Sequence, residues 1–113
     1  MSGADWRAFE IRELMDKRRR SGQPYLEFLR RPSLSCGIYV LPTGAKDLQS
    51  PHDEDEVYFV VSGKGRVRMN GEERAVGSGS ILYIEATSEH SFFEIDEEIT
   101  LLVFFASGGP SAD

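Results

Sequence analysis

The sequence predicts an all-β domain, an antiparallel barrel or sandwich preceded by one short helix. Two observations favour this class. Roughly eight short apolar segments are separated by glycine, proline and asparagine turn signals. Only one stretch has helical periodicity, so helices cannot alternate with strands as they do in a parallel sheet. The 113 residues suffice for a single domain.

The helical signal lies near the N-terminus. Ile11, Leu14 and Met15 are spaced at i, i+3 and i+4, which predicts a short amphipathic helix over residues 10–20. A Ser-Gly pair follows and is expected to end the helix. We assign residues 1–24 to an N-terminal extension that contains this helix.

The strands follow in order through residues 25–106, which we assign to the barrel. Each apolar segment is rich in β-branched or aromatic residues and ends at a turn signal. The strongest turn signal is Asn70-Gly71, which is typical of a hairpin. A polar tail at residues 107–113 is expected to be disordered. The expected strands are residues 25–29, 36–41, 56–61, 66–69, 72–76, 80–84, 90–95 and 99–105.

Composition and charge restrict the class of function. The net charge of -6 and the pI near 4.9 disfavour nucleic-acid binding, which needs a positive field. No apolar run approaches the roughly 20 residues of a membrane span, and the N-terminal sequence does not resemble a secretory signal. The single Cys36 excludes an intrachain disulfide. We therefore expect a cytoplasmic protein that binds neither nucleic acid nor membrane.

The candidate site residues are the two histidines and a carboxylate near one of them. Glu56 follows His52 after three acidic residues, at the start of a predicted strand. The two could reach one ion only if the chain turns sharply at residues 53–55, and Asp favours such turns. His90 begins another predicted strand. Two histidines and one carboxylate suit Fe, Mn, Ni or Zn; the alternative is that both imidazoles lie on the surface.

The spacing around His52 resembles the first motif of the cupin family, G(X)5HXH(X)3-4E(X)6G. The chain fills the motif positions with Gly44, Ser50, His52, Glu56 and Gly63. The spacing is intact, but Ser50 replaces the leading histidine, which is a metal ligand in the family pattern. A hydroxyl is a poor ligand for such ions.

The second cupin motif, G(X)5PXG(X)2H(X)3N, is similar to residues 79–94. The chain fills its positions with Gly79, Glu85, Thr87, His90 and Glu94. The spacing is again intact. The replaced positions are those of turn geometry, and the histidine is kept.

The resemblance implies a cupin-type double-stranded β-helix, or jelly-roll barrel, with a divalent transition metal. Its ligands would be His52, Glu56 and His90. Because Ser50 leaves the set one histidine short, either more positions are open to substrate or the metal is weakly bound or absent. Ser50 could instead hold a metal-bound water.

Tyr58 and Glu94 are the candidate catalytic residues. In regular strands Tyr58 shares a face with Glu56, and Glu94 shares a face with His90, so both are expected to point into the barrel. There they could move a proton. The apolar character of the other inward positions predicts a small-molecule pocket; alternatively, Tyr58 packs the core.

We therefore expect a small metal-binding cupin that binds or transforms a small molecule, with Fe(II) dioxygenase-like or isomerase-like chemistry. The alternative is a non-catalytic binding or sensing module with weak or no metal, which the substitution at Ser50 favours. A purely structural dimerisation domain is a third possibility. The N-terminal extension and an open edge strand also predict a homodimer. Its interface is expected to bury in part Trp6, Phe9, Tyr25 or Phe28.

Overall fold

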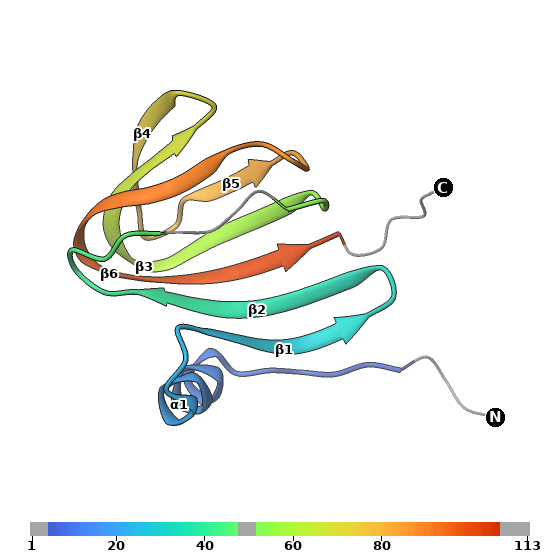
Figure 1. The fold of residues 1–113 in the computed structure, drawn as a ribbon. Coiled ribbons are helices and arrows are strands. Elements are labelled where there is room, and N and C mark those ends of the chain that lie inside the picture. Colours follow the sequence, from blue (N-terminus) through green and yellow to red (C-terminus); the bar gives the residue numbers. More distant parts are fainter. Residues whose placement is uncertain (1–4, 48–51, 107–113) are drawn as a thin grey trace.

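The computed structural model describes residues 5–47 and 52–106. Within these residues the chain forms one helix and an antiparallel sheet that curls over on itself (Figure 1). This confirms the all-β class with one short helix. The predicted disordered tail and Ser50 both lie outside the described residues. The elements are α1 (Ile11–Ser21), β1 (Tyr25–Arg31), β2 (Leu34–Leu41), β3 (Glu56–Met69), β4 (Glu72–Gly77), β5 (Ile81–Ile84) and β6 (His90–Phe105).

The two long strands, β3 and β6, hold the barrel together. The strand order is β1-β2-β6-β3-β4, with β5 also paired to β3. β3 and β6 pair from Glu56 and Phe105 at one end to Met69 and His90 at the other. The first half of β3 pairs with β5 as well, and its second half pairs with β4. Each long strand therefore runs through both layers of the jelly roll.

The prediction of eight short strands is wrong in number, because two pairs of them are continuous. Residues 56–61 and 66–69 join in β3, and residues 90–95 and 99–105 join in β6. The expected turn at Gly63 lies inside β3, where the register to β6 shifts between Val60 and Arg66. Such shifts bend a strand without ending it.

Gly63 is required at this bend. Its φ of 103° is one that other residues rarely adopt, and a Cβ there would collide with the backbone carbonyl of Glu98. The acidic residues 96–98, which lie between two of the predicted strands, belong to the facing part of β6. Glycine is therefore needed where the backbones of β3 and β6 approach too closely for a Cβ.

The helix agrees with its prediction to within one residue at each end. α1 ends at Gly22, whose φ is 74° and whose N–H donates to the carbonyl of Arg19 at 3.2 Å. Leu14 is the buried residue of the helix, and three arginines in its last turn complement the helix dipole. In the part of the chain that the structure describes, no helix is long and apolar enough to cross a membrane.

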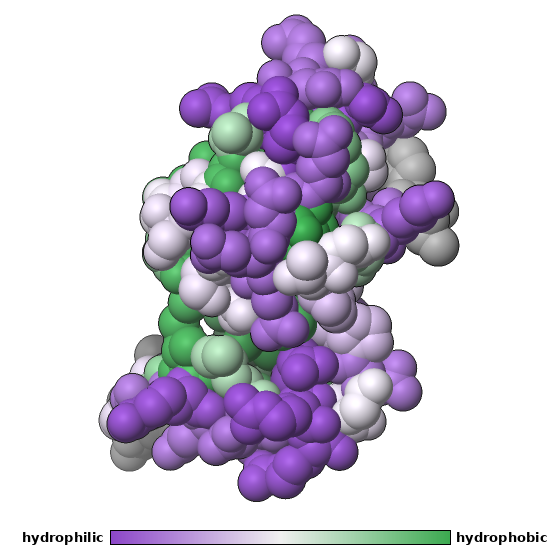
Figure 2. Space-filling model, turned by 90° about the vertical axis from the view of Figure 1, so that its left-hand side faces the viewer, coloured by the Kyte–Doolittle hydropathy of each residue, from purple (hydrophilic) through white to green (hydrophobic). Residues whose placement is uncertain are grey.

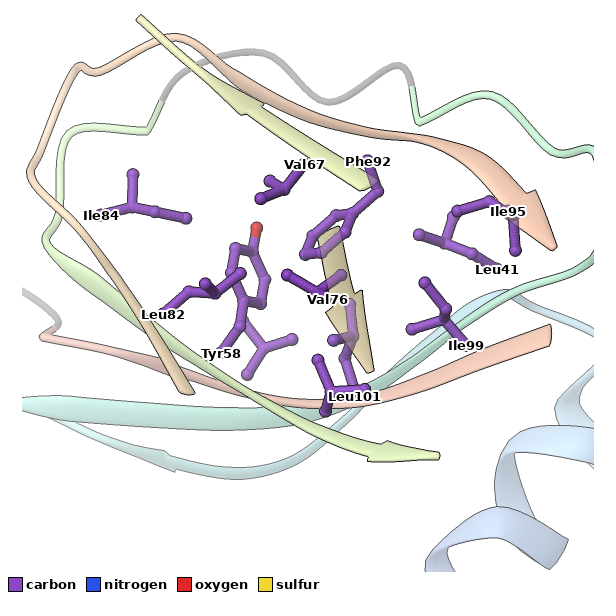
Figure 3. Packing of buried hydrophobic residues seen from close by; sticks show 12 residues of the cluster. Leu41, Tyr58, Val67, Val76, Leu82, Ile84, Phe92, Ile95, Ile99 and Leu101 are labelled. Carbon is purple, nitrogen blue, oxygen red and sulfur yellow. The ribbon is translucent and has the colours of Figure 1, made fainter. Parts of the chain in front are cut away.

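The core fills the space between the two layers. Side chains from β3, β5 and β6 point into one interior, and the hydroxyl of Tyr58 points away from Leu101 (Figure 3). Tyr58 and Phe92 are the largest fully buried side chains, and their rings meet edge to face at 5.2 Å. The buried cluster comprises Leu41, Tyr58, Val60, Val67, Val76, Leu82, Ile84, Phe92, Ile95, Ile99, Leu101 and Val103.

Residues 42–47, which we call the closing loop, cover the open edge of β6. The Gly44 N–H donates to the carbonyl of Ile95 at 3.1 Å. The buried Asp47 accepts from the Phe92 N–H at 3.1 Å and from the Tyr39 hydroxyl at 3.2 Å. These bonds satisfy buried polar groups that no neighbouring strand reaches. They also fix the start of the segment that leads to His52.

Candidate functional site

The structure places the three predicted metal ligands at one end of the barrel. Glu56 begins β3 in one layer and His90 begins β6 in the other, so folding of the sheet brings them face to face. The His90 Nε2 lies 3.3 Å from Glu56 Oε1, and both side chains are 1% exposed. The ring of His52 lies 6.4 Å from that of His90, measured between centroids.

These three residues do not form a closed coordination shell. Within residues 5–47 and 52–106, no group of three His, Cys, Asp or Glu side chains is arranged to hold a metal ion. His90 and Glu56 are in direct contact, whereas the His52 ring is farther away and packs edge-on against Phe105 at 5.0 Å between centroids. A metal held by all three residues would therefore need a change in their arrangement.

The backbone around His52 shows how the predicted turn is built. Asp53 and Glu54 form a bend directly after His52, as the acidic run suggested. The His52 carbonyl accepts from the Thr87 N–H at 2.6 Å, and Asp55 accepts from the Ala86 N–H at 2.8 Å. The loop that carries His52 is thus bound to the loop that precedes β6.

The orientation of the His90 ring assigns its protons. Its Nδ1 lies 3.1 Å from the carbonyl of Ser88, which can only accept, so Nδ1 carries a hydrogen. In the neutral ring Nε2 then has the lone pair. The Tyr58 hydroxyl lies 3.1 Å from Nε2 and also hydrogen-bonds to Glu56, where it helps to lower the pKa of the carboxyl. A fixed Nδ1–H is the usual arrangement behind a metal-bound histidine.

Glu56 faces this lone pair as a second acceptor. Burial raises the pKa of Glu56, although His90 and His52 act to lower it. Its Oε2 is buried and has no hydrogen-bond partner among the described residues. Two acceptors in contact need a cation between them, which is either a proton or a metal. With two imidazoles and one carboxylate, the donor types fit a divalent transition metal.

The two candidate catalytic residues have different outcomes. Tyr58 is fully buried and points inward, as strand alternation predicts. Glu94 is exposed, and the buried position passes to Ile95, so its predicted inward orientation is wrong. The reason is a φ of 47° at Glu94, which shifts the alternation of β6 by one residue. Glu94 does not line the site.

Two cavities adjoin the site, and β1 supplies part of both walls. A cavity of about 270 Å³ is lined by Tyr25, Glu27, Arg30, Ser35, His52, Glu54 and Phe105. A second, of about 200 Å³, is lined by Tyr25, Tyr39, Val103 and Phe105. Sequence reasoning missed the residues of β1. The sequence predicted a strand here, but no local sequence signal indicated that this strand extends the barrel wall.

Comparison with known proteins places the chain in a family. Residues 37–106 match the family model of the Cupin domain. An uncharacterized protein of Streptomyces coelicolor is 41% identical over 100 residues, which cover 88% of this chain and 95% of that protein. A relative at this level over nearly the whole length shares the fold throughout.

Comparison with solved structures supports the fold alone, because their sequence identities to this chain are low. The cupin domain of Schizosaccharomyces pombe Cnp3 has a TM-score of 0.67 at 16% identity, over 74% of this chain and 63% of that one. The DMSP lyase DddQ of Ruegeria pomeroyi has a TM-score of 0.69 at 20% identity, over 78% of this chain and 48% of that one. A conserved barrel protein of Salinispora arenicola gives 0.67 at 17% identity, over 75% and 76%. From its motif spacing, its curled antiparallel sheet and these matches, we conclude that the chain belongs to the cupin family.

Proposed function

We propose that the chain is a small metal-binding cupin that binds or transforms a small molecule at a divalent-metal site inside the barrel. The main support is the contact between two acceptors, His90 Nε2 and Glu56 Oε1, at 3.3 Å in a buried position. A divalent cation would balance both groups and would also engage the unpaired Glu56 Oε2.

The residues that would hold the metal are His52, Glu56 and His90. When bound, the metal would supply a Lewis acid or a centre for oxygen chemistry, so dioxygenase-like and isomerase-like reactions are the two classes we propose. Ser88 holds His90 in the required orientation through its carbonyl. Tyr58 is the hydroxyl donor nearest to this site, and it would donate a proton to, or hold a hydrogen bond with, a substrate oxygen.

A non-catalytic binding or sensing module is the second candidate. It is favoured by the arrangement of the three residues, since the described residues contain no ready metal group. The cavity of about 270 Å³ beside His52 would serve this function equally well. Under this alternative the acceptor pair shares a proton in place of a metal.

Metal content and metal affinity separate the two candidates. Protein purified without chelators is analysed for transition metals, and the chelator-treated protein is then titrated with Co²⁺, whose absorption reports the ligand set. We expect about one metal per chain, lost in His90→Ala and in His52→Ala. Glu94→Gln, at an exposed position of the same motif, is the matched control and should bind as the wild type does. A protein that takes up no metal at micromolar concentrations would support the module.

We also propose that the chain forms a homodimer, through the outer face of the sheet. Two rows of apolar side chains cross β5, β3 and β6 on this face: Ile81, Phe59 and Leu102, then Tyr83, Val57 and Phe104. Ile81 is 69% exposed and Tyr83 is 60% exposed. Figure 2 shows apolar residues along one side of the molecule at mid-height, with hydrophilic residues over its middle and at both ends.

A second copy is the occupant that we favour for this face. The segments outside the described residues contain only Met1 and Leu48 as large apolar residues, so they offer little to cover it. The rows carry no charge, so two copies can meet across a twofold axis without like-charge repulsion. Of the interface residues first expected, Tyr25 lines cavities and Phe9 packs against Phe28 at 4.9 Å, while Trp6 stays 82% exposed.

Light scattering after gel filtration tests the dimer. The wild type is expected at twice the chain mass, and the pair of substitutions Ile81→Lys and Tyr83→Glu should give a folded monomer. Arg74→Glu, an exposed change on β4, should leave the mass unchanged. A wild-type monomer at micromolar concentration would remove the proposal.

We further propose a cytoplasmic location. Cys36 is a free, buried thiol, which suits a reducing compartment. Burial raises the pKa of this thiol, so it is a weak nucleophile. Cell fractionation, with the protein absent from the cytosolic fraction, would contradict this location.

A further inference from the structure

The smaller cavity is enclosed mainly by aromatic rings. Its described lining is Tyr25, Tyr39, Phe105 and Val103, around a space of about 200 Å³. The rings of Tyr25 and Tyr39 meet at 70° with centroids 6.1 Å apart, so they form two walls at a steep angle. We call the three aromatic residues the aromatic cage.

Strand register explains why the three rings converge. Tyr25 pairs with Tyr39 across β1 and β2, and Phe105 pairs with Ser35 across β6 and β2. Gly37 lies between these pairs, and a Cβ there would collide with the Tyr25 ring. The glycine therefore lets the Tyr25 ring lie directly over β2 and form part of the wall.

The surroundings of the cage are negatively charged. The larger cavity shares Tyr25 and Phe105 with the cage and adds Glu27 and Glu54 against one cation, Arg30. That guanidinium is already engaged, since it donates to Glu27 at 2.8 and 3.0 Å. The guanidinium also interacts with the charge of Glu54, but two carboxylates against one cation leave the lining with one net negative charge.

The two tyrosines of the cage experience the same negative surroundings. The Tyr39 hydroxyl donates to the buried Asp47 at 3.2 Å, on the closing loop. Burial, followed by the negative charge of Glu27, raises the pKa of Tyr25 to about 12. The Tyr25 phenol is thus neutral at physiological pH, and both rings line the cavity. The face of such a ring is electron-rich.

We propose that the aromatic cage binds an organic ammonium group, so that the small molecule taken by the barrel is an amine or a quaternary ammonium compound. A cation over aromatic faces is attracted by the ring quadrupoles, and the attraction grows where water is excluded. The adjoining carboxylates strengthen it further. A neutral molecule of the same shape would fill the cavity but would gain neither the attraction to the rings nor the attraction to the carboxylates.

The inference adds a substrate class to the proposed function. The ammonium compound is a substrate, and not only a ligand, if that function is correct. The cage itself contains none of the three candidate metal ligands, so its binding can be measured with and without metal. Failure of the cage and failure of the metal site are therefore separate results.

The test compares choline with 3,3-dimethyl-1-butanol, which has the same shape without the charge. Both are titrated into chelator-treated protein and into protein supplied with Zn²⁺, and binding is followed by calorimetry and by backbone amide NMR shifts. We expect choline to bind at least tenfold more tightly than the alcohol. The shifts should centre on β1, β2 and the end of β6.

Matched variants assign the binding to the cage. Tyr39→Leu should weaken choline at least tenfold with little effect on the alcohol, whereas Tyr39→Phe, which keeps the ring, should weaken it less. Trp6→Leu, which removes an exposed aromatic ring outside the cage, should have no effect. Circular dichroism confirms that each variant is folded.

Three outcomes would overturn the proposal. They are equal affinity for choline and the alcohol, no choline binding in either metal state, and choline binding that Tyr39→Leu leaves unchanged. If choline fails while Zn²⁺ still binds, the cage is wrong and the metal site stands. If choline binds and no metal does, the cage stands as the ligand site of a binding module.

Discussion

Replacement of Asp47 by alanine is the sharpest test of how the barrel is closed. Its carboxylate accepts from the Phe92 N–H at 3.1 Å and from the Tyr39 hydroxyl at 3.2 Å. Phe92 is 1% exposed, so its N–H would lose its partner where water is scarce, at a cost of about 1–3 kcal/mol. The Tyr39 bond adds about 0.5–1.5 kcal/mol. We expect Asp47→Ala to lower the free energy of unfolding by about 2–4 kcal/mol.

Urea unfolding followed by fluorescence measures this loss. For a domain of this size it corresponds to a fall in Tm of at least about 8 °C. Asp47→Asn keeps an oxygen that can accept from Phe92, so it should lose only about 1 kcal/mol. Asp96→Ala, at an exposed position of β6, is the control and should stay within about 0.5 kcal/mol of the wild type. If Asp47→Ala were as stable as Asp96→Ala, the closing loop would not hold the barrel in the way described.

Three further predictions concern the bend, the cage and the candidate metal site. Gly63→Ala should cost at least about 3 kcal/mol, since it combines a strained φ with a collision against the Glu98 carbonyl, and urea unfolding would show it. Because the pKa of Tyr25 is raised to about 12, the folded state holds this proton more tightly than the unfolded state. The stability it contributes is complete below pH 10 and is lost as pH rises through about 12. Tyr25→Phe should remove a step near pH 12 from the absorbance titration, and an unchanged titration would contradict the shift. Tyr58→Phe should keep the free energy of unfolding within about 1.5 kcal/mol of the wild type, because it removes one hydroxyl and keeps the buried ring; a much larger loss in urea unfolding would contradict this.

The class of fold and the helix could be predicted because both depend on local sequence. Periodicity at Ile11, Leu14 and Met15 places α1 to within one residue at each end. The number of strands could not be predicted in the same way. Gly63 has the composition of a turn, yet the chain continues through it because β6 pairs along both sides of the bend. Only a distant part of the sequence decides this.

Some residues of the candidate site could likewise be predicted from the sequence, and one could not. Motif spacing identified His52, Glu56 and His90, and the structure places them at one end of the barrel. Strand alternation gave the right orientation for Tyr58 and the wrong one for Glu94, because a left-handed residue in β6 resets the alternation. A bulge of this kind has no reliable signal when the residue is not glycine.

The course of β3 and β6 through both layers has a consequence for how the protein folds. Their ladder joins Glu56 to Phe105 and Met69 to His90, so neither layer can assemble before the chain has closed large loops. Loop closure of this kind is slow, and we expect folding on the scale of milliseconds to seconds, with no stable half-molecule. The tip at Asn70-Gly71 is a short turn outside this ladder, so an inserted peptide is best tolerated there.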